Sequence, residues 1–197
     1  MLANANERWG SVAKSLHWLI AALIVLEVPS GYLMSSTYGL AQHDKRVQPL
    51  NDLAGQIHHT NGFLILALMI CRAAWSIARP RVAEAPARFQ GQQAASKFVH
   101  LGLYGALFIL PLSGWAALSV FGLAPIWFFN LKGLAPPIMP VQPLNGPFGY
   151  GLFAGIHIWT LYVGAGLLGL HIAAAVWHHW ILKDNVFRRM WPLSEAR

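Results

Sequence analysis

Four apolar segments, each about as long as a bilayer is thick, constrain this chain more than any other feature. Crossing about 30 Å of hydrocarbon takes roughly 20 residues of α-helix. The segments cover residues 16–36, 56–77, 98–121 and 150–182. Only 11% of the residues are charged and 56% are hydrophobic, whereas soluble domains carry about 25% charged residues. The sequence therefore predicts an all-α integral membrane four-helix bundle, formed by a single domain over residues 1–197.

Lysine and arginine gather on one side of these segments. The outer side carries only Lys45, Arg46 and Lys132, whereas the other cations precede the first segment, separate the second from the third, or follow the fourth. Because inner loops of membrane proteins are enriched in Lys and Arg, both termini are predicted to be cytoplasmic. The net charge of +7 thus reflects topology and gives no reason to expect nucleic acid. The first segment lacks a small-residue cleavage site, so we expect it to be retained.

The connections between the segments differ in character. Residues 37–55 are predicted to form a polar outer loop and residues 78–96 a basic inner loop. Residues 122–147 are apolar and hold six prolines, which favours an outer loop that lies in the interface or caps a site. Cys71 is the single cysteine. It excludes a disulfide framework, and we expect a buried, inert thiol.

The fourth segment holds His157 and His171, which stand fourteen residues apart. In a helix this spacing places both side chains within about 40° of one face and about 21 Å apart along the axis. Ionisable residues inside a membrane span are costly and mark functional sites. The two histidines therefore predict one site near each side of the bilayer.

Histidines on other segments complete these two sites at matched depths. His157 pairs with His58 or His59 near the outer face, and His171 pairs with His17 near the inner face. Two facing histidines without cysteines or carboxylates suit bis-imidazole ligation of haem iron, whereas zinc sites use three or four protein ligands. We therefore expect two b haems, bound non-covalently because no C-x-x-C-H motif is present.

Arg72 gives a periodic argument for His58. It follows His58 by fourteen residues and so shares its helix face. Facing the bundle, its guanidinium would bind a haem propionate; the alternative is that it snorkels to the inner interface. Gly62 belongs to a set of small residues that would leave room for a macrocycle or serve plain helix contact.

Three further residues have open roles. His100 lies at the inner depth, where it would handle quinone or protons, or would only pack at the interface. His178 shares a face with His171 but adjoins Lys183 and Asp184, which disfavours a ligand role. Glu27 lies late in the first segment, as a proton relay or as an interfacial carboxylate.

An ordered set of short motifs is spread over essentially the whole chain. The motifs are Leu16-His17-Trp18, His58-x-x-x-Gly62, Pro111-x-x-Gly114, His157 with His171, His178-His179-x-x-x-Lys183-Asp184-Asn185 and Arg189-Met190-Trp191-Pro192. With this set the chain resembles the short, four-helix, dihaem bacterial cytochrome b561 family. The resemblance implies an inner-membrane oxidoreductase with two b haems, ligated by His58/His157 and His17/His171. It also implies quinone as a substrate, because the family includes a superoxide oxidase that reduces ubiquinone and quinol-linked electron carriers.

Three functions compete. The leading hypothesis is electron transfer between an outer-face donor and the quinone pool, including oxidation of superoxide to O2 with reduction of ubiquinone. The second is a quinol-linked relay or anchor subunit of a dehydrogenase, which would meet a periplasmic redox partner. The third is a scaffold whose histidines only form hydrogen bonds. The outer cations Lys45, Arg46 and Lys132 would steer superoxide, or would merely solvate loops. No catalytic residue is predicted.

Overall fold

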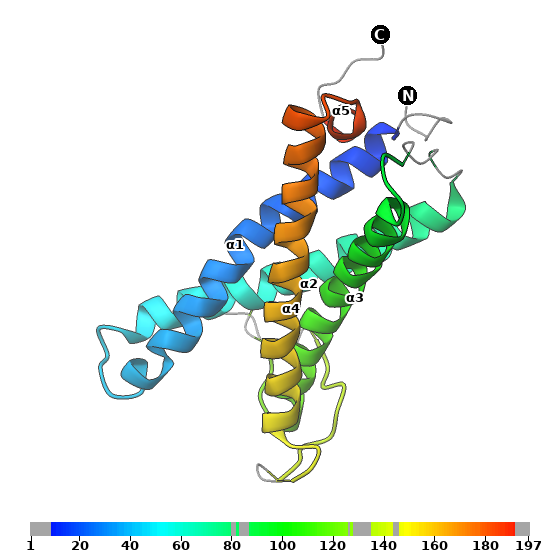
Figure 1. Cartoon of the computed structure of the whole chain (residues 1–197). Helices are drawn as coiled ribbons and strands as arrows, with labels where there is room; N and C mark the ends of the chain where they lie inside the picture. Colours follow the sequence, from blue (N-terminus) through cyan, green and yellow to red (C-terminus); the bar gives the residue numbers. More distant parts are fainter. Residues whose placement is uncertain are drawn as a thin grey trace. The chain divides into compact units, whose positions relative to one another are not determined.

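The computed structural model describes residues 9–79, 82, 87–125, 127, 135–143 and 146–191 (Figure 1). The long elements among them are all helices, which confirms the all-α prediction. They are α1 (Ser11–Ala41), α2 (Gln48–Ala78), α3 (Gln92–Val120) and α4 (Tyr150–Val176). The π-helix η2 (Trp177–Ile181) continues α4, and the short α5 (Val186–Met190) follows it.

Four helices are long and apolar enough to cross a membrane: α1, α2, α3 and the continuous run Tyr150–Ile181. In their most apolar windows only 6–22% of the residues are buried by other parts of the protein. Exposed apolar surface on this scale is unfavourable in water and suits contact with lipid. The predicted four-span membrane protein is therefore confirmed.

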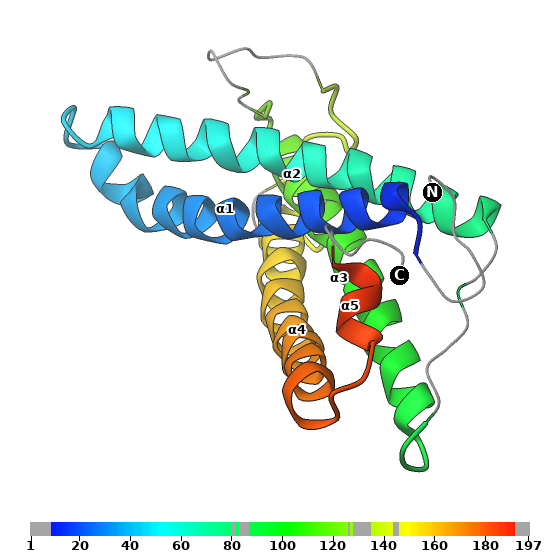
Figure 2. The same cartoon turned by 90° about the horizontal axis from the view of Figure 1, so that it is seen from above.

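The prediction of a polar loop over residues 37–55 is wrong for most of its length. α1 continues to Ala41 and α2 begins at Gln48, and the adjoining parts of α1 and α2 lie side by side (Figures 1 and 2). Asn51 ties them together, because its Nδ2 donates to Met34 O at 2.6 Å and to Thr37 Oγ1 at 2.9 Å. Each helix has 31 residues, about 46 Å at 1.5 Å per residue. Hydropathy reveals only the part that matches the hydrocarbon.

The chain divides into two compact units, and every long helix contributes to both. The first unit comprises Met1–Ile20, Leu68–Leu107 and Leu161–Arg197, and the second comprises Ala21–Ala67 and Phe108–Thr160. His17, His100 and His171 fall in the first unit, and His58 and His157 in the second. A single functional domain over residues 1–197 stays a prediction.

A compact turn closes the chain after η2. Lys183 has a φ of 52°, and the chain then enters α5, beside the end of η2 (Figure 1). Nδ1 of His178 lies 2.6 Å from Asp184 Oδ2, and the Val186 N–H donates to Asp184 Oδ1 at 3.0 Å. Burial alone would raise the pKa of Asp184, but these hydrogen bonds outweigh it and hold the pKa below its usual value. His178 is thus engaged at the chain end.

The start of α1 and the end of α5 are joined within the first unit. The indole Nε1–H of Trp18 donates to the carbonyl of Met190 at 2.7 Å, and its ring lies 5.7 Å from that of Trp191. The C-terminal motif that carried part of the family resemblance therefore packs against the residue that follows His17.

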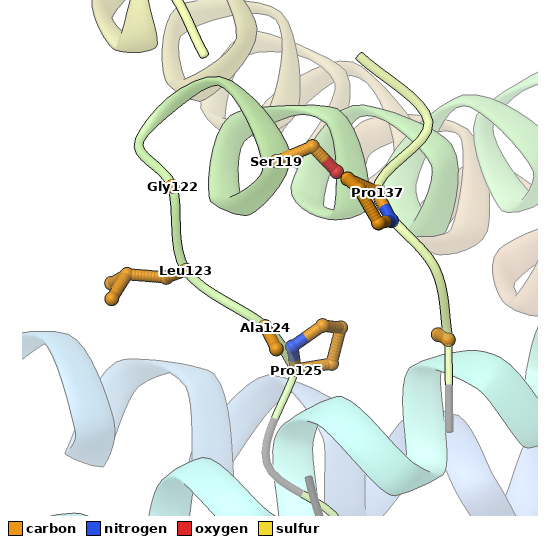
Figure 3. A pocket seen from close by; sticks show the side chains of 7 residues that line it. Ser119, Gly122, Leu123, Ala124, Pro125 and Pro137 are labelled. Carbon is orange, nitrogen blue, oxygen red and sulfur yellow. The ribbon is translucent and has the colours of Figure 1, made fainter. Parts of the chain in front are cut away.

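The described parts of the loop after α3 pack back onto the end of that helix. Trp115 Nε1 donates to Pro136 O at 3.0 Å, and Ile138 N–H donates to Ser119 Oγ at 3.2 Å. Between them lies a recess of about 140 Å³, lined mainly by loop residues around Pro125 and Pro137 (Figure 3). It is too small for a macrocycle, and its serine is already hydrogen-bonded.

The thiol of Cys71 is exposed, so the expected burial is wrong. The apolar neighbours of Cys71 in sequence belong to a membrane helix whose outward face is apolar as well. An apolar environment in the sequence therefore does not separate a core position from a lipid-facing one.

Candidate functional site

His58 on α2 and His157 on α4 face each other within the second unit. Their ring centroids lie 6.1 Å apart and the ring planes are inclined by 80°. His59 lies beside His58, with ring centroids 6.1 Å apart and planes inclined by 58°. Of the two histidines that the sequence left open, His58 is thus the one that meets His157.

The ring of His157 is held by α3. Its Nδ1 lies 2.8 Å from the carbonyl oxygen of Leu110 and 3.3 Å from Ser113 Oγ. A Cβ on Gly114 would lie 3.2 Å from both Cε1 and Nδ1 of the ring. The absence of a side chain at Gly114 therefore leaves the space that the imidazole fills. Nε2 is the ring nitrogen that points away from Leu110 and Ser113.

The ring of His58 is held in the same way by α1. Its Nδ1 lies 3.3 Å from the carbonyl oxygen of Glu27 and 3.1 Å from Oε1 of the Glu27 carboxylate. A Cβ on Gly31 would lie 2.7 Å from Cε1 of His58, closer than real contacts allow. Gly31 is thus required where α1 passes the imidazole.

Two residues of α2 complete the surroundings of Glu27. The amide Nδ2 of Asn61, a residue only 5% exposed, donates to Glu27 Oε2 at 2.9 Å and to Leu23 O at 2.8 Å. A Cβ on Gly62 would lie 3.1 Å from Glu27 Oε1. Gly62, predicted to make room for a cofactor, makes room for this carboxylate.

His17 on α1 and His171 on α4 form a second pair within the first unit. Their ring centroids are also 6.1 Å apart, with planes inclined by 75°. His100 on α3 lies close to the same pair, its ring 5.2 Å from that of His171. Nδ1 of His100 donates to Ser96 O at 2.7 Å, and the side chain is exposed.

Arg72 lies in the same unit, close enough to His17 and His171 to interact with both electrostatically. Its Nε donates to Tyr104 OH at 3.0 Å. Its Nη1 is buried and has no hydrogen-bond partner among the described residues. A buried guanidinium nitrogen with an unused donor suits an anionic group such as a propionate. It disfavours the alternative in which the Arg72 guanidinium snorkels to the inner interface.

Both pairs have the separation that a metal between two imidazoles requires. A metal–imidazole bond is about 2.0–2.1 Å and the ring centre lies about 1.2 Å further on, which places two opposed ring centres about 6.5 Å apart. Among the described residues, no group of three or more His, Cys, Asp and Glu could hold an ion. Two ligands suffice for haem, whose porphyrin supplies the other four nitrogens. The residues present therefore fit a haem at each pair.

The three cations predicted to lie on the outer side are Lys45, Arg46 and Lys132, and they differ in what the structure shows of them. Arg46 Nε and Nη2 donate to the two carboxylate oxygens of Asp44 at 3.1 and 3.0 Å. These hydrogen bonds and that from the Arg46 main chain hold the pKa of Asp44 below its usual value, so the charges of Arg46 and Asp44 offset each other. Lys45 is exposed, and Lys132 lies outside the described residues.

Facing histidine pairs inside the spans of a helical membrane protein are typical of membrane b-type cytochromes. The chain itself belongs to the prokaryotic cytochrome b561 family, whose family model matches residues 8–193. The family resemblance inferred from the motifs is therefore confirmed, and with it a haem-binding membrane protein of electron transport.

Individual relatives align over nearly the whole chain. Cytochrome b561 homolog 2 of Escherichia coli (strain K12) is 26% identical over 202 residues, which cover 98% of this chain and 96% of that protein. Cytochrome b561 homolog 1 of the same organism is 26% identical over 185 residues, 90% of this chain and 93% of that protein. A Yersinia pestis protein named "Probable superoxide oxidase CybB" is 28% identical over 188 residues, 95% of this chain and 97% of that protein.

Proposed function

We propose that this cytochrome holds two b haems, one at His58/His157 and one at His17/His171, and passes single electrons between an outer-face donor and the quinone pool. The observation that carries the proposal is the pair of ring separations, both 6.1 Å, each between histidines on different helices. Haem iron, when bound, cycles between the ferric and ferrous states without a change of ligand. The protein alone should then contain two haems per chain, measured as pyridine haemochrome against protein concentration.

The residues around each pair support this assignment in different ways. The Nδ1 contacts of His58 and His157 fix each ring and leave Nε2 for the metal, which is how ligating histidines are commonly oriented. Arg72, with its unpartnered Nη1, would bind a propionate beside His17/His171. His100, exposed next to His171, is a candidate for quinone or proton handling at that end.

The orientation rests on the distribution of cations. Lys and Arg are in excess beside those ends of the spans that belong to the first unit. This excess supports cytoplasmic termini in the inner membrane of a bacterium. His58/His157 would then lie near the outer face and His17/His171 near the inner face. A reporter fused after Arg197 should give a cytoplasmic signal, and a periplasmic signal would invert the depths of both pairs.

The proposed donor is superoxide. It would lose one electron to become O2, and two such electrons with two protons would convert a quinone into a quinol. The support is the likeness to a protein named as a superoxide oxidase and the position of Lys45 and Lys132 in outer connections. Cations steer small anions, an effect that salt weakens. Arg46 contributes less, because Asp44 neutralises it.

The donor is tested by stopped-flow reduction of the purified protein by superoxide, with ubiquinone as acceptor. The rate should fall with salt and in Lys45→Gln and Lys132→Gln, whereas Lys183→Gln, beyond the opposite end of α4, serves as the control. A slow rate that ignores both salt and these substitutions would exclude superoxide. The relay-subunit alternative would then be tested by co-purification with a dehydrogenase.

A further inference from the structure

His58 and His157 are supported by matching backbone features on two different helices. On α1, the carbonyl of Glu27 faces Nδ1 of His58, and Gly31 lies under the ring. On α3, the carbonyl of Leu110 faces Nδ1 of His157, with the glycine again four residues later. We call each arrangement a carbonyl–glycine support. The two supports differ in the side chain of the residue that supplies the carbonyl, which is glutamate on α1 and leucine on α3.

The carboxylate is the better placed acceptor for His58. Nδ1 of His58 is 3.1 Å from Oε1 of Glu27 and 3.3 Å from its carbonyl oxygen. That carbonyl already accepts the hydroxyl of Ser30 at 3.0 Å. For His157, by contrast, the carbonyl lies at 2.8 Å and a leucine side chain offers no alternative. One histidine of the pair thus shares its proton with a carboxylate and the other with a peptide group.

The surroundings hold the Glu27 carboxylate in this position. Asn61 donates to the second oxygen, Oε2, at 2.9 Å, and the same amide is anchored on Leu23 O at 2.8 Å. Gly62 leaves the space that Oε1 occupies. Asn61 and Gly62 follow His58 by three and four residues, so α2 presents the histidine, the amide and the gap on one face.

We propose that Glu27 is a positioning residue for the haem at His58/His157: it accepts the Nδ1 proton of His58, presents Nε2 to the iron and lowers the reduction potential of that haem. The inference rests on the proposed haem assignment. A ligating histidine that donates its other N–H to a carboxylate becomes a more basic ligand. Such a ligand stabilises the ferric state relative to the ferrous state.

The test is a potentiometric titration in a His171→Ala background, which leaves haem only at His58/His157. Glu27→Gln keeps the size of the side chain but replaces the carboxyl group by an amide, a weaker acceptor for the Nδ1 proton, so the midpoint potential should rise. Asp52→Asn is the matched control, because Asp52 is an exposed carboxylate six residues before His58 on α2. It should leave the potential unchanged.

A second variant covers the case in which Glu27→Gln fails to accumulate. Gly62→Ala keeps the glutamate but places a Cβ 3.1 Å from Oε1, which displaces the carboxylate from Nδ1. Its potential should rise by less than that of Glu27→Gln.

The outcomes separate this inference from the proposed function. If Glu27→Gln and Gly62→Ala retain their haem with an unchanged potential, or if Asp52→Asn shifts the potential equally, the role of Glu27 is refuted while the cytochrome assignment stands. If the His171→Ala protein holds no haem, or if it still holds haem after His157 is also replaced by alanine, the ligand assignment itself fails.

Discussion

The His58/His157 and His17/His171 pairs share one geometry and differ in the side chains beside them. Both have ring centroids 6.1 Å apart and planes inclined by 80° and 75°. A carboxylate contacts the first pair through Glu27, whereas the guanidinium of Arg72 lies near the second. Spacing of the ligands thus defines what each pair can bind, and the neighbouring side chains define how readily the bound group is reduced.

If a haem is bound at each pair as proposed, the two neighbouring side chains predict a direction for electron flow. A carboxyl group that accepts the Nδ1 proton makes His58 a more basic ligand, which lowers the potential of a haem bound there. A guanidinium raises the potential of a nearby haem, because it repels the positive charge gained on oxidation. Electrons should therefore pass from the His58/His157 haem to the His17/His171 haem. With the proposed topology, this is transfer from an outer donor towards the cytoplasmic side.

The largest expected effect comes from removing a ligand from one pair at a time. His157→Ala should lose the haem at His58/His157 and keep the other, and His171→Ala should do the reverse. Each variant should contain half the wild-type haem, measured as pyridine haemochrome per chain. Full haem content in either variant would break the assignment of that pair.

A smaller effect is expected from filling the space beside His58. Gly31→Ala places a Cβ 2.7 Å from Cε1 of the ring, and overpacking of this kind costs about 1–3 kcal/mol. We expect partial loss of the His58/His157 haem and a lower thermal midpoint, with the His17/His171 haem retained.

Gly39→Ala is the control on the same helix, because nothing lies within 4 Å of a Cβ there. Alanine in a helix is favoured over glycine by about 0.5–1 kcal/mol, so this variant should be as stable as the wild type or slightly more so. Equal haem loss in both variants would show that the loss does not come from a Cβ at position 31 meeting the ring of His58.

Arg72→Gln should shift a potential in the direction opposite to Glu27→Gln. Loss of the guanidinium removes a positive charge near His17 and His171, so the potential of that haem should fall. A change of the order of 59 mV, one decade in a one-electron equilibrium, is the expected size. The titration is done in the His157→Ala background, with Arg79→Gln as control, since Arg79 is exposed and stacks on Trp75 with its guanidinium carbon 4.8 Å from the ring centroid.

The smallest effect is expected from Asp184, which contacts His178 and Val186 rather than a residue of either pair. Asp184→Asn removes the carboxylate that contacts His178 and Val186, and a pair near the surface contributes about 0.2–1 kcal/mol. Because folding lowers the pKa of Asp184, its contribution is present above the unfolded value of about 3.9 and disappears as the pH falls through the folded value. Thermal unfolding should separate variant from wild type at pH 7, and the difference should shrink as the pH falls below about 3.9.

Features that depend on one helix at a time could be predicted from the sequence. The four spans follow from length and hydropathy, and the fourteen-residue interval between His157 and His171 follows from helix periodicity. Matching depths then identified His17 as the partner of His171, and His58 or His59 as the partner of His157. The ring contacts in the structure bring His17 to His171 and His58 to His157. The haem content of the His157→Ala and His171→Ala variants tests whether these residues bind haem.

Features that depend on the register between helices could not be predicted in this way. Glu27 and His58 contact each other across α1 and α2, and no pattern within either helix specifies that register. Gly31 and Gly114 did carry a signal, because each lies two or three residues after a proline inside an apolar span. The signal shows that the two helices are locally unusual, but not which side chain fills the space.

The inclination of the two ring planes has a magnetic consequence. When the planes of two axial imidazoles are nearly perpendicular, neither in-plane direction of the porphyrin is preferred, and two iron d orbitals become almost equal in energy. The unpaired electron of the low-spin ferric state then keeps much of its orbital angular momentum. With angles of 80° and 75° between the rings, a haem bound at either pair as proposed should give a strongly anisotropic electron paramagnetic resonance spectrum with a large maximal g value. A rhombic spectrum from either site would show that its rings turn towards a parallel arrangement when the haem binds.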